Sequence, residues 1–162
     1  MFKLFTTKNE RIYEKLKDIC KTDSKILRTE NGKPYFEDCP LLFSVSHSQD
    51  LALIAVCESR IGVDMELIRK RDFDAVLKRF SEREKQEINN DTLSFLKNWT
   101  VKEAFIKMLG GTLAEDLMRL EYVGGELFLD GIKTDCELFT GTGDGFVYSV
   151  CVEKANANDN VN

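Results

Sequence analysis

Two carboxylates lie two residues apart in an apolar stretch near the middle of the chain. Asp64 and Glu66 alternate there with Val63 and Met65. Side chains two apart on a β-strand project from the same face, and like charges side by side repel each other unless a cation lies between them. Oxygen-only ligands favour Mg²⁺ or Mn²⁺ over Zn²⁺. The pair predicts either a metal site or the hydrated polar face of an edge strand.

A second pair of charged residues lies on a long apolar segment further along the chain. Glu103 and Lys107 are four residues apart, so on a helix they share one face. On a helical wheel, apolar residues surround the segment 92–109 on nearly every side, which is the pattern of a buried helix. Burying charge costs free energy, so such residues usually have a tight partner or a function. We therefore expect Glu103 and Lys107 to be functional, with a simple salt bridge as the alternative.

The single histidine, His47, ends an apolar strand and lies between Ser46 and Ser48. Small polar groups at a strand end suit contact with an anion, and so does Lys33 in the glycine turn at residues 31–34. A lone histidine is, however, more often structural than catalytic. These residues indicate an anion-binding site, with a structural role for His47 as the alternative.

The composition argues against zinc, membrane insertion and nucleic-acid binding. The five cysteines are widely spaced without a CxxC pair, so we expect reduced thiols, with Cys57 and Cys151 packed as small hydrophobic residues. No apolar run approaches the roughly 20 residues of a membrane helix, and the N-terminus is too polar for a secretory signal. We expect a cytoplasmic protein. The formal charge of −5 disfavours general affinity for nucleic acid.

The predicted elements follow the order strands, helices, strands. An amphipathic helix is predicted at residues 9–20, with the turn 31–34 after it. Apolar and alternating runs then predict strands at 41–46, 51–57 and 60–66. This order indicates an α+β fold with antiparallel sheets rather than a doubly wound parallel fold.

The second half of the chain begins with helices and ends with strands. Ser81 and Glu84 predict a capping box, and the long helix is expected to end at Gly110. The glycine-rich run 141–145 lacks a following Lys-Ser/Thr, so it is interpreted as a flexible hairpin loop and not as a phosphate loop. Short helices are predicted at 73–80 and 82–90, a long helix at 92–109, and strands at 120–123, 126–130, 133–139 and 146–152.

Taken together, these segments resemble the 4′-phosphopantetheinyl transferase superfamily, specifically its Sfp-type enzymes. Each motif alone is weak, but the ordered set is specific and covers roughly residues 31–113. The motifs are Gly32-Lys33-Pro34, the run FSVSHS at 43–48, the run IGVDME at 61–66, the run WTVKEAFIK at 99–107 and the ending Gly110-Gly111-Thr112-Leu113.

The resemblance implies a pseudo-dimeric α+β fold of two similar lobes, with coenzyme A bound in the cleft between them. We accordingly expect a shortened N-terminal lobe at 1–59, a C-terminal lobe with the metal site at 60–153 and a flexible tail at 154–162. Only about 30 residues precede the Gly-Lys-Pro turn, fewer than is usual in this family. Arg28 and Lys25 are candidates to replace the basic residues that lie upstream in other members.

The resemblance also implies a reaction, in which the 4′-phosphopantetheine arm of coenzyme A moves to a serine of an apo acyl or peptidyl carrier protein. Adenosine 3′,5′-bisphosphate is released. Asp64, Glu66 and Glu103 match the ligands of Mg²⁺, with Mn²⁺ as an alternative. Glu103 also matches the candidate base, for which a metal-bound water is the alternative, and Lys107 matches the lysine that contacts the phosphates.

The coenzyme A contacts are carried over in the same way. His47 with Ser46 matches the histidine that holds the 3′-phosphate. Gly32, Lys33 and Pro34 match the turn that packs on the adenine and approaches its phosphates. Two other functions stay open: a non-catalytic relative that binds coenzyme A or a carrier protein, and a different phosphotransferase or metal-dependent hydrolase.

A cluster of basic residues follows the strand that carries the paired carboxylates. Such a cluster is often only a solvated face. Carrier proteins tend to be acidic, so it is also a candidate surface for docking the carrier. A monomer is expected, with a homo-oligomer as the alternative. The cluster consists of Arg69, Lys70, Arg71, Lys78 and Arg79.

Overall fold

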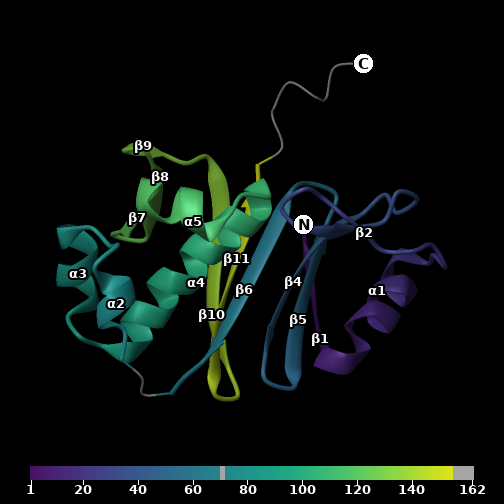
Figure 1. The fold of residues 1–162 in the computed structure, drawn as a ribbon, viewed down its shortest axis with the longest axis horizontal. Coiled ribbons are helices and arrows are strands. Elements are labelled where there is room, and N and C mark those ends of the chain that lie inside the picture. The colour runs from purple at the N-terminus through teal and green to yellow at the C-terminus, as the bar shows by residue number, and fades with distance from the viewer. Residues whose placement is uncertain (70–71, 155–162) are drawn as a thin grey trace.

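Two three-stranded antiparallel sheets form the centre of the computed structural model, which describes residues 1–69 and 72–154 (Figure 1). The predicted α+β class with antiparallel sheets is confirmed. The first sheet has the order β1-β5-β4, with β1 at Lys3–Lys8, β4 at Leu42–Ser48 and β5 at Leu51–Cys57. The second has the order β10-β11-β6, with β6 at Ile61–Leu67, β10 at Cys136–Gly143 and β11 at Phe146–Glu153.

The inner faces of the two sheets share one hydrophobic core. Alternation along each strand sends every second side chain toward that core. Leu53 and Ala55 of β5 pack there with Val63 and Met65 of β6 and Val150 of β11. The outer faces are left for helices, so the two halves of the molecule meet sheet against sheet.

Helix α1 (Ile12–Cys20) covers the outer face of the first sheet. Leu16 is fully buried, and it packs in one cluster with Ile54 and Val56 of β5. The helix predicted at 9–20 is confirmed, except that its first turn, Asn9–Arg11, is a 3₁₀-helix.

Helix α4 (Thr92–Leu109) covers the outer face of the second sheet, as the pattern at 92–109 predicted. Asp91 caps its start by accepting a hydrogen bond from the Ser94 amide at 2.7 Å, and Gly110 ends it with φ 75°. A Cβ atom on Gly62 of β6 would lie 1.8 Å from the carbonyl oxygen of Ala104. The helix backbone therefore rests directly on β6.

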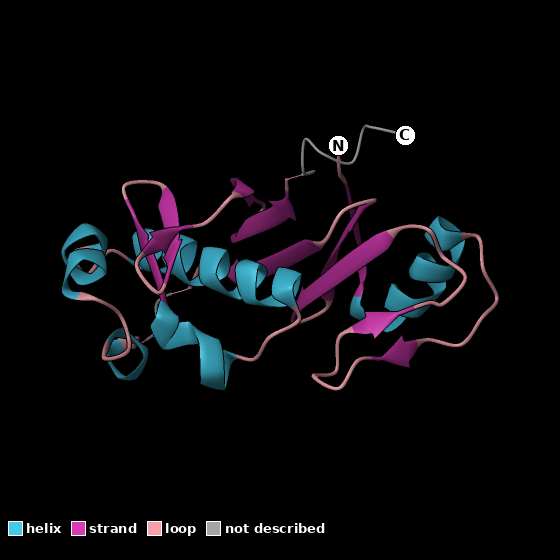
Figure 2. Ribbon diagram, turned by 90° about the horizontal axis from the view of Figure 1, so that it is seen from above, coloured by secondary structure: helices cyan, strands magenta, loops and turns pink. Residues whose placement is uncertain are grey.

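Smaller elements surround the outer end of α4, and α1 lies near the other end of the elongated molecule (Figure 2). The Ser81–Glu84 capping box is present, as predicted. The helix predicted at 73–80 has only one regular turn. These elements are α2 (Asp74–Leu77), α3 (Glu82–Ile88), α5 (Leu113–Asp116), a 3₁₀-helix (Leu117–Arg119), β7 (Leu120–Val123), β8 (Glu126–Leu129) and β9 (Ile132–Lys133).

The structure corrects the glycine-rich region near the C-terminus. Gly141 and Gly143 were expected in a loop, but both belong to β10. A Cβ atom on Gly141 would lie 2.5 Å from the Tyr148 hydroxyl, and one on Gly143 would lie 2.5 Å from the Phe146 ring. The glycines thus leave room for cross-strand aromatic rings. The single strand predicted at 133–139 is likewise divided into β9 and β10.

The thiols agree with the sequence prediction, and the structure describes only the first residue of the predicted tail. Lys154, expected in the tail, pairs with Asp135 at 2.6 Å, and the rest of the predicted tail lies outside the described residues. The lobe limits 1–59 and 60–153 stay a prediction. All five cysteines are free, and Cys57 and Cys151 are buried. Among the described helices, none is both long and apolar enough to span a bilayer.

Candidate functional site

Asp64 lies where β6, β4 and α4 meet, with only 3% of its surface exposed. Its Oδ1 atom accepts hydrogen bonds from Lys107 Nζ at 2.6 Å and from Ser46 Oγ at 2.8 Å. Burial raises the pKa of Asp64, although Lys107 and Ser46 both favour its charged form. The buried Oδ2 atom has no hydrogen-bond partner among the described residues. Because an unpaired buried carboxylate oxygen is costly, this atom suits a cation ligand.

The serines of β4 hold the edge of β6 beside this carboxylate. Ser44 Oγ accepts a hydrogen bond from the Val63 amide and Ser46 Oγ accepts one from the Met65 amide, both at 3.1 Å. The two hydroxyls replace the strand partner that this edge of β6 would otherwise lack. Ser46 was expected to contact the 3′-phosphate, but its hydroxyl is committed to Asp64 and to β6.

Lys107 lies between the two carboxylates that the sequence grouped with it. Its Nζ atom is 2.6 Å from Asp64 Oδ1 and 3.9 Å from Glu103 Oε2. Glu66 also acts on Asp64, because its negative charge contributes to the raised pKa of that carboxyl. The structure thus brings Asp64, Glu103 and Lys107 together.

The described part of the chain contains no ready-made group of three or more metal-ligating side chains. The ammonium of Lys107 supplies positive charge beside Asp64. The unpaired Oδ2 atom and the all-oxygen donor set nevertheless fit Mg²⁺. Asp64, Glu66 and Glu103 therefore remain predicted metal ligands.

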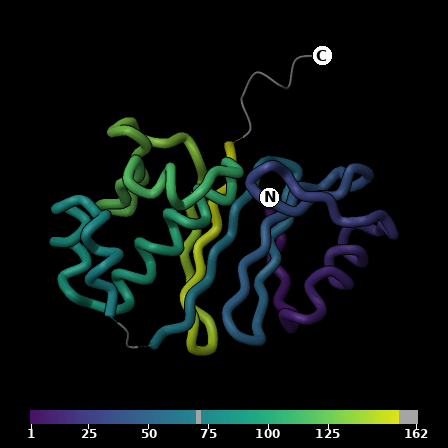
Figure 3. Tube along the Cα trace, in the orientation of Figure 1, coloured from purple at the N-terminus to yellow at the C-terminus, as the bar shows by residue number. Residues whose placement is uncertain are grey.

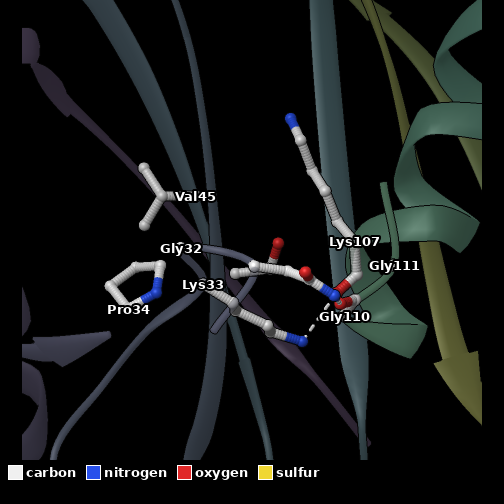
Figure 4. A pocket seen from close by; sticks show the side chains of 9 residues that line it. Gly32, Lys33, Pro34, Val45, Lys107, Gly110 and Gly111 are labelled. Carbon is white, nitrogen blue, oxygen red and sulfur yellow. Dashed lines mark hydrogen bonds between the residues drawn. The ribbon is translucent and has the colours of Figure 1, made fainter. Parts of the chain in front are cut away.

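Lys33 reaches the end of α4 from the turn between β2 (Leu27–Arg28) and β3 (Pro34–Tyr35). Its Nζ atom donates to the carbonyl oxygen of Lys107 at 2.7 Å (Figure 4). It also donates to the carbonyl oxygens of Ile61 at 3.1 Å and Met108 at 3.4 Å. Burial, with the nearby Arg60 guanidinium, lowers the pKa of Lys33 to about 8. The side chain expected to approach phosphates is thus bound to backbone carbonyls.

A pocket of about 240 Å³ lies between the two halves, beside these contacts. The predicted Gly-Lys-Pro turn forms one wall, and the end of α4 forms the other (Figure 4). The pocket is lined by Asn31, Gly32, Lys33, Pro34, Ser44, Val45, Lys107, Gly110 and Gly111.

His47 opens on a different pocket, because successive residues of β4 point to opposite faces. This second pocket, of about 270 Å³, is also lined by Arg28, Tyr13 and Pro34. Arg28 donates to the Tyr13 hydroxyl at 2.7 Å and to the Gly32 carbonyl at 2.8 Å. His47 and Ser46 therefore do not face one common group, whereas His47 and Arg28 share a pocket. Pro34 lines both pockets.

Lys102 lies within the WTVKEAFIK run, but no role was predicted for it from the sequence. Its side chain is fully buried, with Nζ 2.6 Å from Glu84 Oε1 and 4.0 Å from the centre of the Phe80 ring. Glu84 also accepts a hydrogen bond from the Tyr122 amide at 2.9 Å. The pair ties α3, α4 and β7 together, so Lys102 supports the helix that carries Glu103. The burial of Glu84 inside a capping box gave no signal in the sequence.

The basic cluster is only partly described. Arg69, Lys78 and Arg79 are exposed on the surface around α2, while Lys70 and Arg71 lie outside the described residues. Because these three side chains are exposed, they could contact an acidic partner.

Comparison with known proteins identifies relatives of this chain. Residues 60–130 match the model of the 4′-phosphopantetheinyl transferase superfamily. The chain is 37% identical over 102 residues to 4′-phosphopantetheinyl transferase HetI of Nostoc sp., covering 52% of this chain and 40% of that protein. It is 39% identical over 92 residues to 4′-phosphopantetheinyl transferase AcpT of Salmonella typhimurium, covering 51% and 48%.

A third relative aligns over more of the chain. The sequence is 32% identical over 149 residues to 4′-phosphopantetheinyl transferase psf-1 of Bacillus pumilus, covering 84% of this chain and 64% of that protein. The chain thus spans about half the length of several curated relatives that it matches. These matches confirm the family resemblance that the ordered motifs indicated.

Proposed function

Because this chain is a relative of the 4′-phosphopantetheinyl transferases, we propose that it transfers the 4′-phosphopantetheine arm of coenzyme A to a serine of an apo acyl or peptidyl carrier protein. Adenosine 3′,5′-bisphosphate is the second product. The observation that carries the proposal is the buried Asp64, whose Oδ2 atom is unpaired beside Lys107 and Glu103. Lys107 also lines the pocket between the halves, so this charged group adjoins the pocket that we propose for coenzyme A.

The chemistry needs alignment and neutralisation of charge more than covalent help from the protein. Asp64, Glu66 and Glu103 would hold Mg²⁺, or Mn²⁺ as the alternative, which supplies positive charge for the pyrophosphate when bound. The side chain of Lys107 is 31% exposed, so its ammonium can turn from Asp64 toward a phosphate oxygen. Its charge then stabilises the departing bisphosphate.

The serine hydroxyl of the carrier is a weak nucleophile and needs a base. Glu103 projects from α4 on the same face as Lys107, so it would lie beside the phosphates that Lys107 is proposed to contact. We propose Glu103 as the group that accepts the serine proton, with a water molecule as the alternative base.

Coenzyme A would extend across the two pockets that Pro34 joins. Gly32 and Pro34 would pack on the adenine. His47 would hold the 3′-phosphate, and we add Arg28, which lines the same pocket. Ser46 is better assigned to the support of Asp64 than to a phosphate contact.

The test is transfer itself. The full chain is mixed with coenzyme A, Mg²⁺ or Mn²⁺ and a panel of apo acyl and peptidyl carrier proteins, and the mass of each carrier is followed. We expect one carrier to gain the mass of phosphopantetheine. Glu103→Gln should abolish the gain, while the exposed Glu137→Gln serves as a matched control. If no carrier gains mass with either metal, the proposed activity is refuted.

A non-catalytic relative is the second candidate, favoured by the ion pair of Lys107 with Asp64 at 2.6 Å, which would have to break before Lys107 could reach a phosphate. It predicts that coenzyme A or a carrier binds without turnover. Calorimetry with coenzyme A and each apo carrier, run beside the mass assay, separates the two candidates.

We propose a cytoplasmic monomer that docks its acidic carrier on Arg69, Lys78 and Arg79. Charge reversal at Lys78 and Arg79 should slow carrier association and weaken its salt dependence. An unchanged association rate at low salt would remove this surface from the proposal.

A further inference from the structure

The turn at residues 29–34 caps the helix that carries Glu103 and Lys107. The last carbonyls of an α-helix have no partner within the helix and carry partial negative charge. Lys33 Nζ donates to the carbonyls of Lys107 and Met108, and Asn31 Nδ2 donates to the carbonyl of Gly110 at 2.8 Å. The end of α4 is therefore completed by residues that lie far away in the sequence, in the other half of the molecule (Figure 3).

Hydrogen bonds among residues 28–33 fix the backbone of this turn. The Gly32 amide donates to the Thr29 carbonyl at 2.8 Å, and the Thr29 amide donates to the Lys33 carbonyl at 2.9 Å. Gly32 adopts φ 82°, a conformation that suits glycine, and Arg28 binds its carbonyl. Because its backbone is fixed in this way, the turn can hold the end of α4 in place through the side chains of Asn31 and Lys33.

The ammonium of Lys33 has no donor left for a ligand. An ammonium group carries three N–H donors and no acceptor. In the structure, the carbonyls of Lys107, Ile61 and Met108 lie within 3.4 Å of Nζ. A phosphate contact from this side chain would require the loss of at least one of these bonds.

Both the backbone and the side chain of Lys107 are held in place. Its carbonyl is held by Lys33, and its own ammonium pairs with Asp64 at 2.6 Å. Gly62 lies in close backbone contact with the last two turns of α4, at the Ala104 carbonyl and the Met108 amide. Gly62 thus allows this end of the helix to lie close to β6, while the cap holds the carbonyl of Lys107 itself and so fixes the backbone from which the Lys107 side chain begins.

We propose that Lys33 is a positioning residue, which fixes the last turn of α4 from the opposite half and so sets the place of the Lys107 ammonium. This inference rests on the proposed function, because it assigns Lys107 to the transferred group. It replaces direct phosphate contact as the role of the Lys33 side chain.

The kinetic test is the split between kcat and KM. Lys33→Met keeps the length of the side chain but removes the donors. We expect its kcat to fall about 10- to 100-fold, as misplacement of a catalytic group does. The KM for coenzyme A should change less than about threefold, because no ligand contact is lost. Lys33→Arg restores donors and should recover part of kcat, and the exposed Lys3→Met is the matched control.

Hydrogen exchange tests the cap without any reaction. The amides of Gly110 and Gly111 bind the carbonyls of Lys107 and Ile106 at the helix end. In Lys33→Met these amides should exchange at least about tenfold faster, while exchange in α3 stays unchanged. If Lys33→Met does not fold, Asn31→Ala, at an exposed position, should show the same effect more weakly.

Two results overturn the inference. If Lys33→Met raises the KM for coenzyme A with kcat unchanged, then Lys33 binds the ligand directly. If exchange at the helix end is unchanged in both variants, there is no cap. An inactive wild-type protein would instead refute the proposed function, and the exchange experiment would still decide whether the cap exists.

Discussion

At the scale of single residues, Asp64 is the residue on which the proposed metal site depends most. Asp64→Asn preserves shape and the hydrogen bond from Ser46, but it removes the charge that would attract a metal. We expect kcat to fall at least about 100-fold, the order of a lost charge contact in a transition state. The melting temperature should change by only a few degrees, because the exposed part of Lys107 can take its ammonium into water.

The measurement is carrier mass against time at several Mg²⁺ concentrations. Asp135→Asn removes an exposed carboxylate that pairs with Lys154, and it should leave the rate unchanged. Full activity in Asp64→Asn would contradict the metal assignment.

Cys136 is the cysteine expected to react first. A hydrogen bond from Cys151 stabilises its thiolate, with help from Thr134 and Lys154, and outweighs partial burial, so its pKa is lowered to about 7. Burial raises the pKa of Cys20 to about 12. The reactive thiolate of Cys136 therefore forms as the pH rises through about 7, while Cys20 remains a thiol.

Alkylation by iodoacetamide, followed peptide by peptide with mass spectrometry, measures this difference. The labelling rate at Cys136 should reach half its maximum near pH 7, and Cys136→Ser should remove the fast phase. Equal labelling of Cys20 at pH 7 would contradict the assignment.

The sequence predicted which residues lie together better than it predicted which atoms they bind. It selected Asp64, Glu103 and Lys107, and the structure brings these three together. It also selected Ser46 and Lys33 as ligand contacts, yet their polar atoms bind β6, Asp64 and the end of α4. Residue type and spacing define the available donors, but only the packing of the two halves decides where each donor goes.

At the scale of elements, the contact between α4 and β6 depends on one glycine. A Cβ atom on Gly62 would lie 1.8 Å from the Ala104 carbonyl and 2.4 Å from the Met108 amide, and both are backbone atoms that cannot rotate away. Gly62→Ala should therefore lower the free energy of unfolding by about 3 kcal/mol, the upper end of the usual cost of overpacking. Urea denaturation measures the change.

Gly111→Ala is the matched control for this contact. Its added Cβ would meet a carboxylate oxygen of Asp116, which belongs to a side chain that can rotate. We expect its cost to be less than about half that of Gly62→Ala. Equal costs would mean that the helix backbone does not rest on β6 as described.

Local patterns predicted the elements where capping and periodicity agree. Gly110 ends α4 as expected, and the capping box of Ser81 and Glu84 starts α3. The prediction was wrong at Gly141 and Gly143, because their need for space comes from rings on the neighbouring strand. A local pattern carries no information about that cross-strand contact.

At the scale of the whole molecule, the two halves meet through an apolar core between their sheets and through polar contacts around the pockets. A ligand that spans these pockets stabilises the folded state according to its affinity. At a concentration 100 times its dissociation constant, the gain is about 2.7 kcal/mol. Coenzyme A should therefore raise the melting temperature of the full chain.

The shift in melting temperature also distinguishes the proposed 3′-phosphate contacts from the rest of the proposed coenzyme A site. Dephospho-coenzyme A lacks the 3′-phosphate assigned to His47 and Arg28, so it should give a smaller shift than coenzyme A. His47→Ala should reduce the shift with coenzyme A to that level and leave the shift with dephospho-coenzyme A unchanged, because the lost contact exists only with the extra phosphate. Arg28→Met should also reduce the shift with coenzyme A, and because Arg28 holds the Gly32 carbonyl, it should reduce the shift with dephospho-coenzyme A to a smaller extent. If His47→Ala weakens both ligands equally, the pocket shared by His47 and Arg28 does not hold the 3′-phosphate.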